Sequence, residues 1–204
     1  MKHEIDHILI TGKKNHGKTH FTKWLIPQLI DPVIIIDPMN EYADISDHVH
    51  SGFLELSQSI KENKGIKKGV HCLKVLTRKD ALFALRMLAK IQKKVTIVLE
   101  EADKWCAPNS VNKDVLEMTD TGAHFGISLL FVARRTGRID INLRAQTTFK
   151  VTFKQTEPAD LATLDKELED SKIVAQLNKY EFLVYGDHIP NRFKKLTLNK
   201  VSKL

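Results

Sequence analysis

Residues 12–19 constrain the fold more than any other part of the chain. Two glycines stand five positions apart, and Lys and Thr follow the second at once, which is the spacing of a loop that wraps phosphate groups with its backbone N–H groups. The apolar run at residues 8–10 predicts a buried strand before the loop, and the apolar residues after it recur near helical spacing. The loop consists of Gly12, Lys13, Lys14, Asn15, His16, Gly17, Lys18 and Thr19.

Each part of this loop predicts a contact with a nucleoside triphosphate. Lys18 is expected to reach the β- and γ-phosphates, and the Thr19 hydroxyl is expected to ligate Mg²⁺. The N-terminus of the following helix, which includes His20, adds a positive dipole to the phosphate site. We therefore expect the chain to bind ATP with Mg²⁺ and to hydrolyse ATP.

Three continuous apolar runs, at residues 33–36, 95–99 and 127–132, are typical of parallel strands that are buried on both faces. A further strand is expected at residues 70–76, and leucines every third residue predict a helix over about 79–93. This alternation predicts an α/β fold whose mostly parallel sheet is flanked by helices.

Shorter patterns follow towards the C-terminus. Alternation at residues 149–153 predicts a strand, and a helix is expected to begin between 156 and 158. Residues 181–185 and 193–198 predict two more strands, which form a possible antiparallel edge. The least ordered segment is expected at residues 57–69, which are rich in Lys and polar residues.

Two carboxylates end the apolar strand at residues 95–99. A nucleotide hydrolase needs one acid for the metal's water shell and one that positions and deprotonates the attacking water, both beside the phosphate loop. We assign Glu100 to Mg²⁺, with Asp103 as the alternative, and Glu101 to the water.

A run of arginines follows the strand at residues 127–132. Guanidinium groups suit the charge that spreads over a γ-phosphate during its transfer, but they also suit a DNA backbone or a solvated loop. Arg134 and Arg135 are the candidates for a catalytic role.

Composition limits the remaining possibilities. A chain of 204 residues with 42% apolar residues is expected to form one domain over residues 1–204. Its two cysteines give no disulfide framework, and no apolar run approaches the roughly 20 residues that cross a bilayer. The net charge of +7 includes a lysine cluster at residues 61–79 and a second at Lys194, Lys195, Lys200 and Lys203, which favours a polyanionic partner such as DNA.

Four stretches together give the chain a family likeness. These are the loop at residues 12–19, Ile-Asp-Pro-Met-Asn-Glu-Tyr at 36–42, Leu-Glu-Glu-Ala-Asp at 99–103, and the segment from His124 to Arg135. With them the chain resembles the HerA/FtsK-type DNA-pumping ATPases, most closely the genome-packaging ATPases of icosahedral viruses with an internal membrane. The resemblance implies a translocase of double-stranded DNA that works as a homo-oligomeric ring, a hexamer, in the host cytoplasm or at the packaging vertex of the virion. Docking on a capsid-vertex or membrane protein is a further possible partnership.

The chain departs from this family in its arginines. The family usually ends the strand at 127–132 with Thr-Gln-Arg, whereas this chain has Ala133, Arg134 and Arg135, so Arg134 would replace the Gln that senses phosphate. Members often carry an Arg where this chain has Ala123. An arginine that acts on a neighbouring subunit would then come from Arg135, Arg138 or Arg144.

Three other functions remain as alternatives. The first is another DNA-linked ATPase, such as a repair or conjugation motor. The second is a small-molecule or nucleotide kinase, although two acids at a strand end are more typical of hydrolases. The third is a GTP-dependent switch, which would need Asn-Lys-x-Asp, and the segment Asn112-Lys113-Asp114 lacks the intervening residue.

Overall fold

The computed structural model describes residues 7–29, 32–75, 77–91, 94–109, 111, 113–168, 170–186, 189 and 193–198. Some of the residues used in the sequence-based expectations lie outside these ranges: Leu76, Lys93, Asn112, Lys200 and Lys203.

Within the described residues, nine strands form one sheet in the order β3-β4-β2-β5-β6-β1-β7-β8-β9. The strands from β3 to β7 in this order are parallel, and β8 and β9 add an antiparallel edge next to β7. Their bounds are β1 Ile8–Thr11, β2 Val33–Asp37, β3 His48–His50, β4 Val70–Lys74, β5 Val95–Leu99, β6 Ile127–Ala133, β7 Phe149–Phe153, β8 Glu181–Gly186 and β9 Phe193–Thr197.

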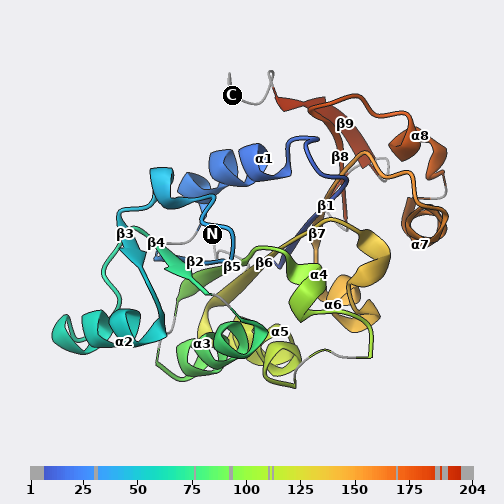
Figure 1. Cartoon of the computed structure of the whole chain (residues 1–204). Coiled ribbons are helices and arrows are strands. Elements are labelled where there is room, and N and C mark those ends of the chain that lie inside the picture. The colour runs from blue at the N-terminus through green and yellow to red at the C-terminus, as the bar shows by residue number, and fades with distance from the viewer. Residues whose placement is uncertain are drawn as a thin grey trace.

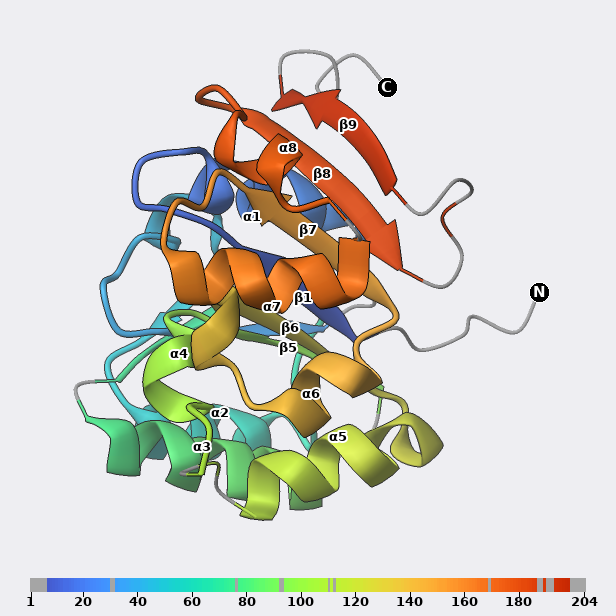
Figure 2. The ribbon, with the colours of Figure 1, turned by 90° about the vertical axis from the view of Figure 1, so that its right-hand side faces the viewer.

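Helices cover both faces of this sheet. In Figure 1, α1 lies above the strands, and α2, α3 and α5 lie below them; in Figure 2, α7 crosses in front of β1 and β7. The α-helices are α1 Lys18–Leu25, α2 Phe53–Glu62, α3 Arg78–Ile91, α4 Ala102–Trp105, α5 Lys113–Phe125, α6 Ile141–Gln146, α7 Pro158–Leu168 and α8 Lys172–Ala175, and short 3-10 turns are η1 Ile26–Gln28, η2 Ala43–Ile45 and η3 Thr136–Arg138.

The core divides along the pleat of the strands. In β1, Leu9 packs with the helices on one face, whereas Ile8 and Ile10 pack with Phe21 of α1 on the other. Every residue of β1, β2, β5 and β6 is buried, which agrees with their continuous apolar sequences. Because these strands are parallel, the carboxyl ends of β1, β2, β5 and β6 meet at one edge of the sheet.

The expected fold class, a mostly parallel sheet flanked by helices with an antiparallel C-terminal edge, is confirmed. The expectation that residues 57–69 are the least ordered is wrong for their first part, because α2 extends to Glu62. Leu56 and Ile60 of α2 are buried, and this apolar stripe is sufficient to dock a helix that otherwise carries polar residues. No helix in the described part of the chain is long and apolar enough to cross a membrane.

Candidate nucleotide-binding site

The loop between β1 and α1 has the backbone of a phosphate cradle. Gly12 and Gly17 have φ of 141° and 113°, values that favour glycine. A Cβ on Gly12 would lie 2.5 Å from the Phe153 Cβ atom, and one on Gly17 would lie 2.9 Å from Tyr180 Cδ1. Lys13 N–H donates to the Lys154 carbonyl at 2.8 Å, so the loop is also anchored to the end of β7.

Lys18, the first residue of α1, turns back over this loop. Its Nζ donates to the carbonyls of Gly12 at 2.7 Å and Lys13 at 3.1 Å. Burial lowers the pKa of Lys18 below its usual range, and the nearby Glu100 carboxyl partly offsets this effect. The ammonium group is therefore partly desolvated, which strengthens its attraction for a phosphate anion.

Thr19 donates its hydroxyl to Glu41 Oε2 at 3.1 Å. Glu41 follows β2 in a turn that Asp37 organises, because the buried Asp37 carboxylate accepts the backbone N–H groups of Met39 at 3.1 Å and Tyr42 at 2.9 Å. Glu41 was not among the site residues expected from the sequence. The sequence offered one signal for Glu41, its place as the acidic residue of the Asp-Pro-x-x-Glu-Tyr stretch. Its hydrogen-bond partner Thr19 lies 22 residues away, so local sequence patterns do not connect the two.

Glu100 is buried at the end of β5 and accepts a hydrogen bond from the Tyr42 hydroxyl. Its other oxygen accepts the backbone N–H of Glu101 at 3.1 Å. Burial raises the pKa of Glu100 to about 7, although these two hydrogen bonds act in the opposite direction. Thr19, Glu41 and Glu100 provide hydroxyl and carboxylate oxygens, the ligands that Mg²⁺ prefers.

Glu101 adopts the left-handed region at φ 49° and forms ion pairs with Lys104 and Arg134. Burial raises the pKa of Glu101, but the two cations outweigh this effect and hold the pKa below its usual range. Arg134 also places its backbone N–H 3.4 Å from Asp103 Oδ1. Glu101 is thus ionised at neutral pH, as a proton acceptor must be.

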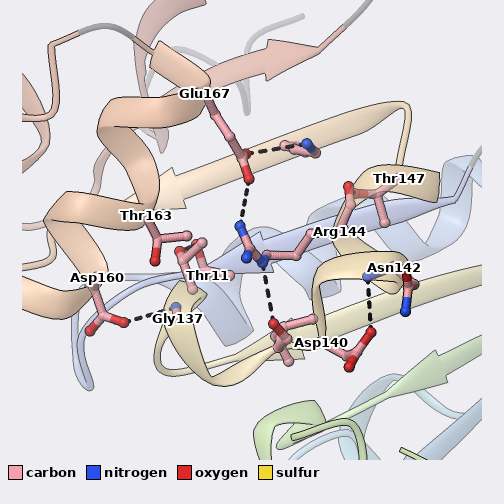
Figure 3. Close-up of polar contacts among 12 residues, drawn as sticks. Thr11, Gly137, Asp140, Asn142, Arg144, Thr147, Asp160, Thr163 and Glu167 are labelled. Atoms are coloured by element: carbon pink, nitrogen blue, oxygen red, sulfur yellow. Dashed lines mark hydrogen bonds and ion pairs between the residues drawn. The ribbon is translucent and has the colours of Figure 1, made fainter. Parts of the chain in front are cut away.

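Arg135 points to a different part of the molecule. Its Nε donates to Oδ2 of the buried Asp160 at 2.9 Å, and the other oxygen of Asp160 accepts the Gly137 N–H at 2.9 Å. Figure 3 shows Asp160 of α7 beside Gly137 and Arg144 of α6 reaching Glu167, at 2.8 Å. These ion pairs attach α7 to the segment that follows β6.

One cleft of about 390 Å³ brings most of these groups together. It contains the assigned Lys18, Thr19, Glu100, Glu101 and Arg134, but Arg135 and Lys13 line a neighbouring hollow that Arg134 also borders. The described residues that line the cleft are Lys14, Asn15, Gly17, Lys18, Thr19, His20, Met39, Glu41, Glu100, Glu101, Val132, Ala133, Arg134, Lys179 and Tyr180. The sequence-based expectations gave no site role to six of these residues: Met39, Glu41, Val132, Ala133, Lys179 and Tyr180.

A glycine-bounded loop between a parallel strand and a helix, facing acids at the end of another strand, gives this chain the fold of a P-loop ATPase. No protein-family model matches the sequence, and no curated protein sequence does so either.

Solved structures do match. The genome-packaging NTPase B204 of Sulfolobus turreted icosahedral virus 2, in complex with ATP-gammaS, superposes with a TM-score of 0.75 at 20% identity and covers 95% of this chain and 97% of its own. VirB4 of Thermoanaerobacter pseudethanolicus gives 0.63 at 11% identity, covering 94% and 88%. The conjugation coupling protein TcpA of pCW3 gives 0.61 at 12% identity, covering 95% and 60%. The resemblance to HerA/FtsK-type ATPases is therefore confirmed in the fold.

Proposed function

We propose that this chain is an ATP-driven translocase of double-stranded DNA that packages a viral genome into its capsid. The observation that carries the proposal is the single cleft in which the phosphate loop, two strand-end carboxylates and Arg134 meet. The fold of a viral packaging NTPase, matched along nearly the whole chain, supports the choice of a motor. A packaging motor would work in the host cytoplasm or at the packaging vertex of the virion, where it could dock on a capsid or membrane protein.

Hydrolysis would follow from the positions of Lys18, Glu101 and the groups that would hold the metal. Lys18 neutralises the β- and γ-phosphates, and Glu101 orients a water molecule and accepts its proton as the water oxygen bonds to the γ-phosphorus. The bond from the γ-phosphorus to the bridging oxygen breaks, which leaves ADP and phosphate. Mg²⁺, held by Thr19 and Glu100 with Glu41 orienting the Thr19 hydroxyl, would supply charge neutralisation at the phosphate oxygens.

Arg134 connects the acid to the substrate. It pairs with Glu101 in this structure, and a γ-phosphate in the same cleft would offer its guanidinium a partner of higher charge. Transfer of Arg134 to the phosphate would remove one of the cations that lower the pKa of Glu101. The carboxylate would then become a stronger base when substrate is bound.

A ring, as the resemblance implies, would also place a neighbour's arginine at each site. Arg135 and Arg144 would have to leave Asp160 and Glu167 to act there, whereas Arg138 is already exposed in η3. We therefore place Arg138 first among the three candidates for this role.

In the described part of the chain, lysines of the two clusters lie towards opposite edges of the sheet. Lys67 and Lys68 are exposed just before β4, which is next to the edge strand β3, and Lys194 and Lys195 are exposed on β9. A single short stretch of duplex would contact one edge rather than both.

Addition of linear duplex DNA is expected to raise ATP turnover several-fold, and the effect should decline steeply between about 50 and 200 mM salt because lysine–phosphate contacts release counterions. Steady-state phosphate release measures this. The paired variants Lys67→Gln with Lys68→Gln, and Lys194→Gln with Lys195→Gln, identify which edge contacts DNA. If DNA did not change ATP turnover and the protein transferred phosphate to a small acceptor, the results would favour a kinase.

The Glu41→Gln variant is expected to raise the Mg²⁺ concentration needed for half-maximal ATP binding by roughly 10- to 100-fold, the usual effect of losing an outer-shell metal partner. Its carboxylate is the group that contacts the Thr19 hydroxyl. Titration of Mg²⁺ against binding of a non-hydrolysable ATP analogue measures the shift. The matched control is Glu55→Gln, which changes an exposed residue of α2. If Glu100→Gln shifted the Mg²⁺ requirement and Glu41→Gln did not, Glu100 would be the carboxylate that binds the metal.

A further inference from the structure

Some of the residues that line the cleft have no part in the chemistry described above. Lys18, Glu101 and Arg134 lie where the terminal phosphate would react, and the lining also includes His20, Lys179 and Tyr180. The ring of Tyr180 lies 6.4 Å from that of His20, centroid to centroid, and the Lys179 Nζ is 5.0 Å from its centre. His20 lies in α1 directly after the phosphate loop, whereas Lys179 and Tyr180 lie in the turn before β8, far from the loop in sequence.

The direction of the substrate can be deduced from the loop. Lys18 and the strand-end acids mark the γ-phosphate, and the N-terminal turn of α1 binds the phosphates that precede it. A nucleoside triphosphate is longer than its phosphate chain, so the sugar and base must extend away from Glu101 and Arg134. Within the same cleft, the aromatic rings among the lining residues are those of His20 and Tyr180.

The position of Tyr180 is imposed by the surrounding structure. It adopts the left-handed region at φ 68°, which costs free energy for a residue other than glycine. Two backbone hydrogen bonds hold it there: its N–H donates to the His16 carbonyl, and its carbonyl accepts the Leu198 N–H, both at 3.1 Å. The first of these bonds ties Tyr180 directly to the phosphate loop, and its ring packs against Gly17.

Although it is so constrained, Tyr180 remains 38% exposed. A large aromatic group held in a strained backbone, attached to the phosphate loop and open to the cleft, is suited to contact a flat ligand. An aromatic face with a cation close to it is the type of surface on which nucleobases stack.

We propose that Tyr180 is the platform on which the base of the bound nucleoside triphosphate stacks, with Lys179 and His20 beside it. The proposal rests on the proposed function, because it assumes that the cleft binds a nucleotide. Stacking depends on the π-face that every base has, so this contact contributes affinity without reading hydrogen-bonding edges. It predicts that ATP and GTP bind with similar affinity through Tyr180.

The test compares ATP with inorganic tripolyphosphate, which has the phosphates but no base. Binding of each is measured by calorimetry with Mg²⁺. Tyr180→Ala is expected to weaken ATP binding by about tenfold or more, the typical effect of losing one base–aromatic stack. It should leave tripolyphosphate binding unchanged, while Tyr180→Phe should bind both ligands like the unchanged protein. Phe125→Ala removes an exposed aromatic outside the cleft and serves as the matched control.

Other outcomes would overturn the proposal. Equal losses for ATP and tripolyphosphate in Tyr180→Ala would show that the ring only supports the loop through Gly17. Unchanged ATP binding in that variant would show that the base lies elsewhere. If the unchanged protein bound neither ligand, the proposed function itself would fail, and the base platform with it.

Discussion

Substitution of Lys18 by alanine is expected to reduce ATP hydrolysis by on the order of 10³-fold, the scale seen when a preorganised charge-stabilising group is removed from an active site. Two effects combine. The phosphates lose the cation that would neutralise them, and the loop loses the ammonium that links the carbonyls of Gly12 and Lys13. Binding of ATP should weaken as well, because the cation also attracts the phosphates in the ground state, although less strongly than in the transition state.

Turnover and nucleotide binding, both measured on purified protein, check this prediction. Lys23→Ala is a close control, since Lys23 lies on the same helix but pairs with the exposed Asp44 at 2.6 Å. Such a surface pair contributes little to stability, so this variant should fold and hydrolyse ATP normally. If the Lys18→Ala protein folded and its ATP turnover were unchanged, residues 12–19 would not be the phosphate-binding loop.

The Glu101→Gln variant is expected to bind ATP but to hydrolyse it about 10²- to 10⁴-fold more slowly, the range for loss of a general base. The amide can still orient water but cannot accept its proton. The substitution also ends the ion pairs with Lys104 and Arg134, but both cations are about half exposed and this costs little stability. Single-turnover hydrolysis, alongside ATP affinity, separates the chemical step from binding.

Two further variants identify the base. Asp103→Asn changes a neighbouring carboxylate of α4 and should have a small effect on the rate. Glu100→Gln should perturb metal binding before it affects proton transfer. If Glu100→Gln instead produced an ATP-bound, inactive protein while Glu101→Gln remained active, the two acids would have exchanged roles.

The sequence predicted what depends on local pattern. Continuous β-branched and leucine-rich runs identified β2, β5 and β6 because a strand buried on both faces consists almost entirely of apolar residues. The loop before α1 was predicted because the phosphate-binding conformation requires glycines, Lys and Thr at this fixed spacing, which can be recognised in the sequence.

What the sequence did not reveal depends on contacts between distant residues. Glu41 meets Thr19, and Tyr180 meets His16, only because the fold returns those segments to the carboxyl edge of the sheet. Arg135 seemed equivalent to Arg134 from its charge, yet adjacent residues diverge at a strand end, and a buried carboxylate on α7 fixes its direction.

The outermost strand of the sheet, β9, has one further consequence. An edge strand carries backbone N–H and C=O groups that can pair with another protein chain, and lysines are a common means of preventing this. Lys194 and Lys195 are exposed on β9, and at the other edge β3 has only three residues. These exposed lysines are therefore expected to oppose edge-to-edge pairing between copies of this protein. Replacements at these two positions should be glutamine rather than valine or threonine, whose preference for strands would invite edge-to-edge pairing.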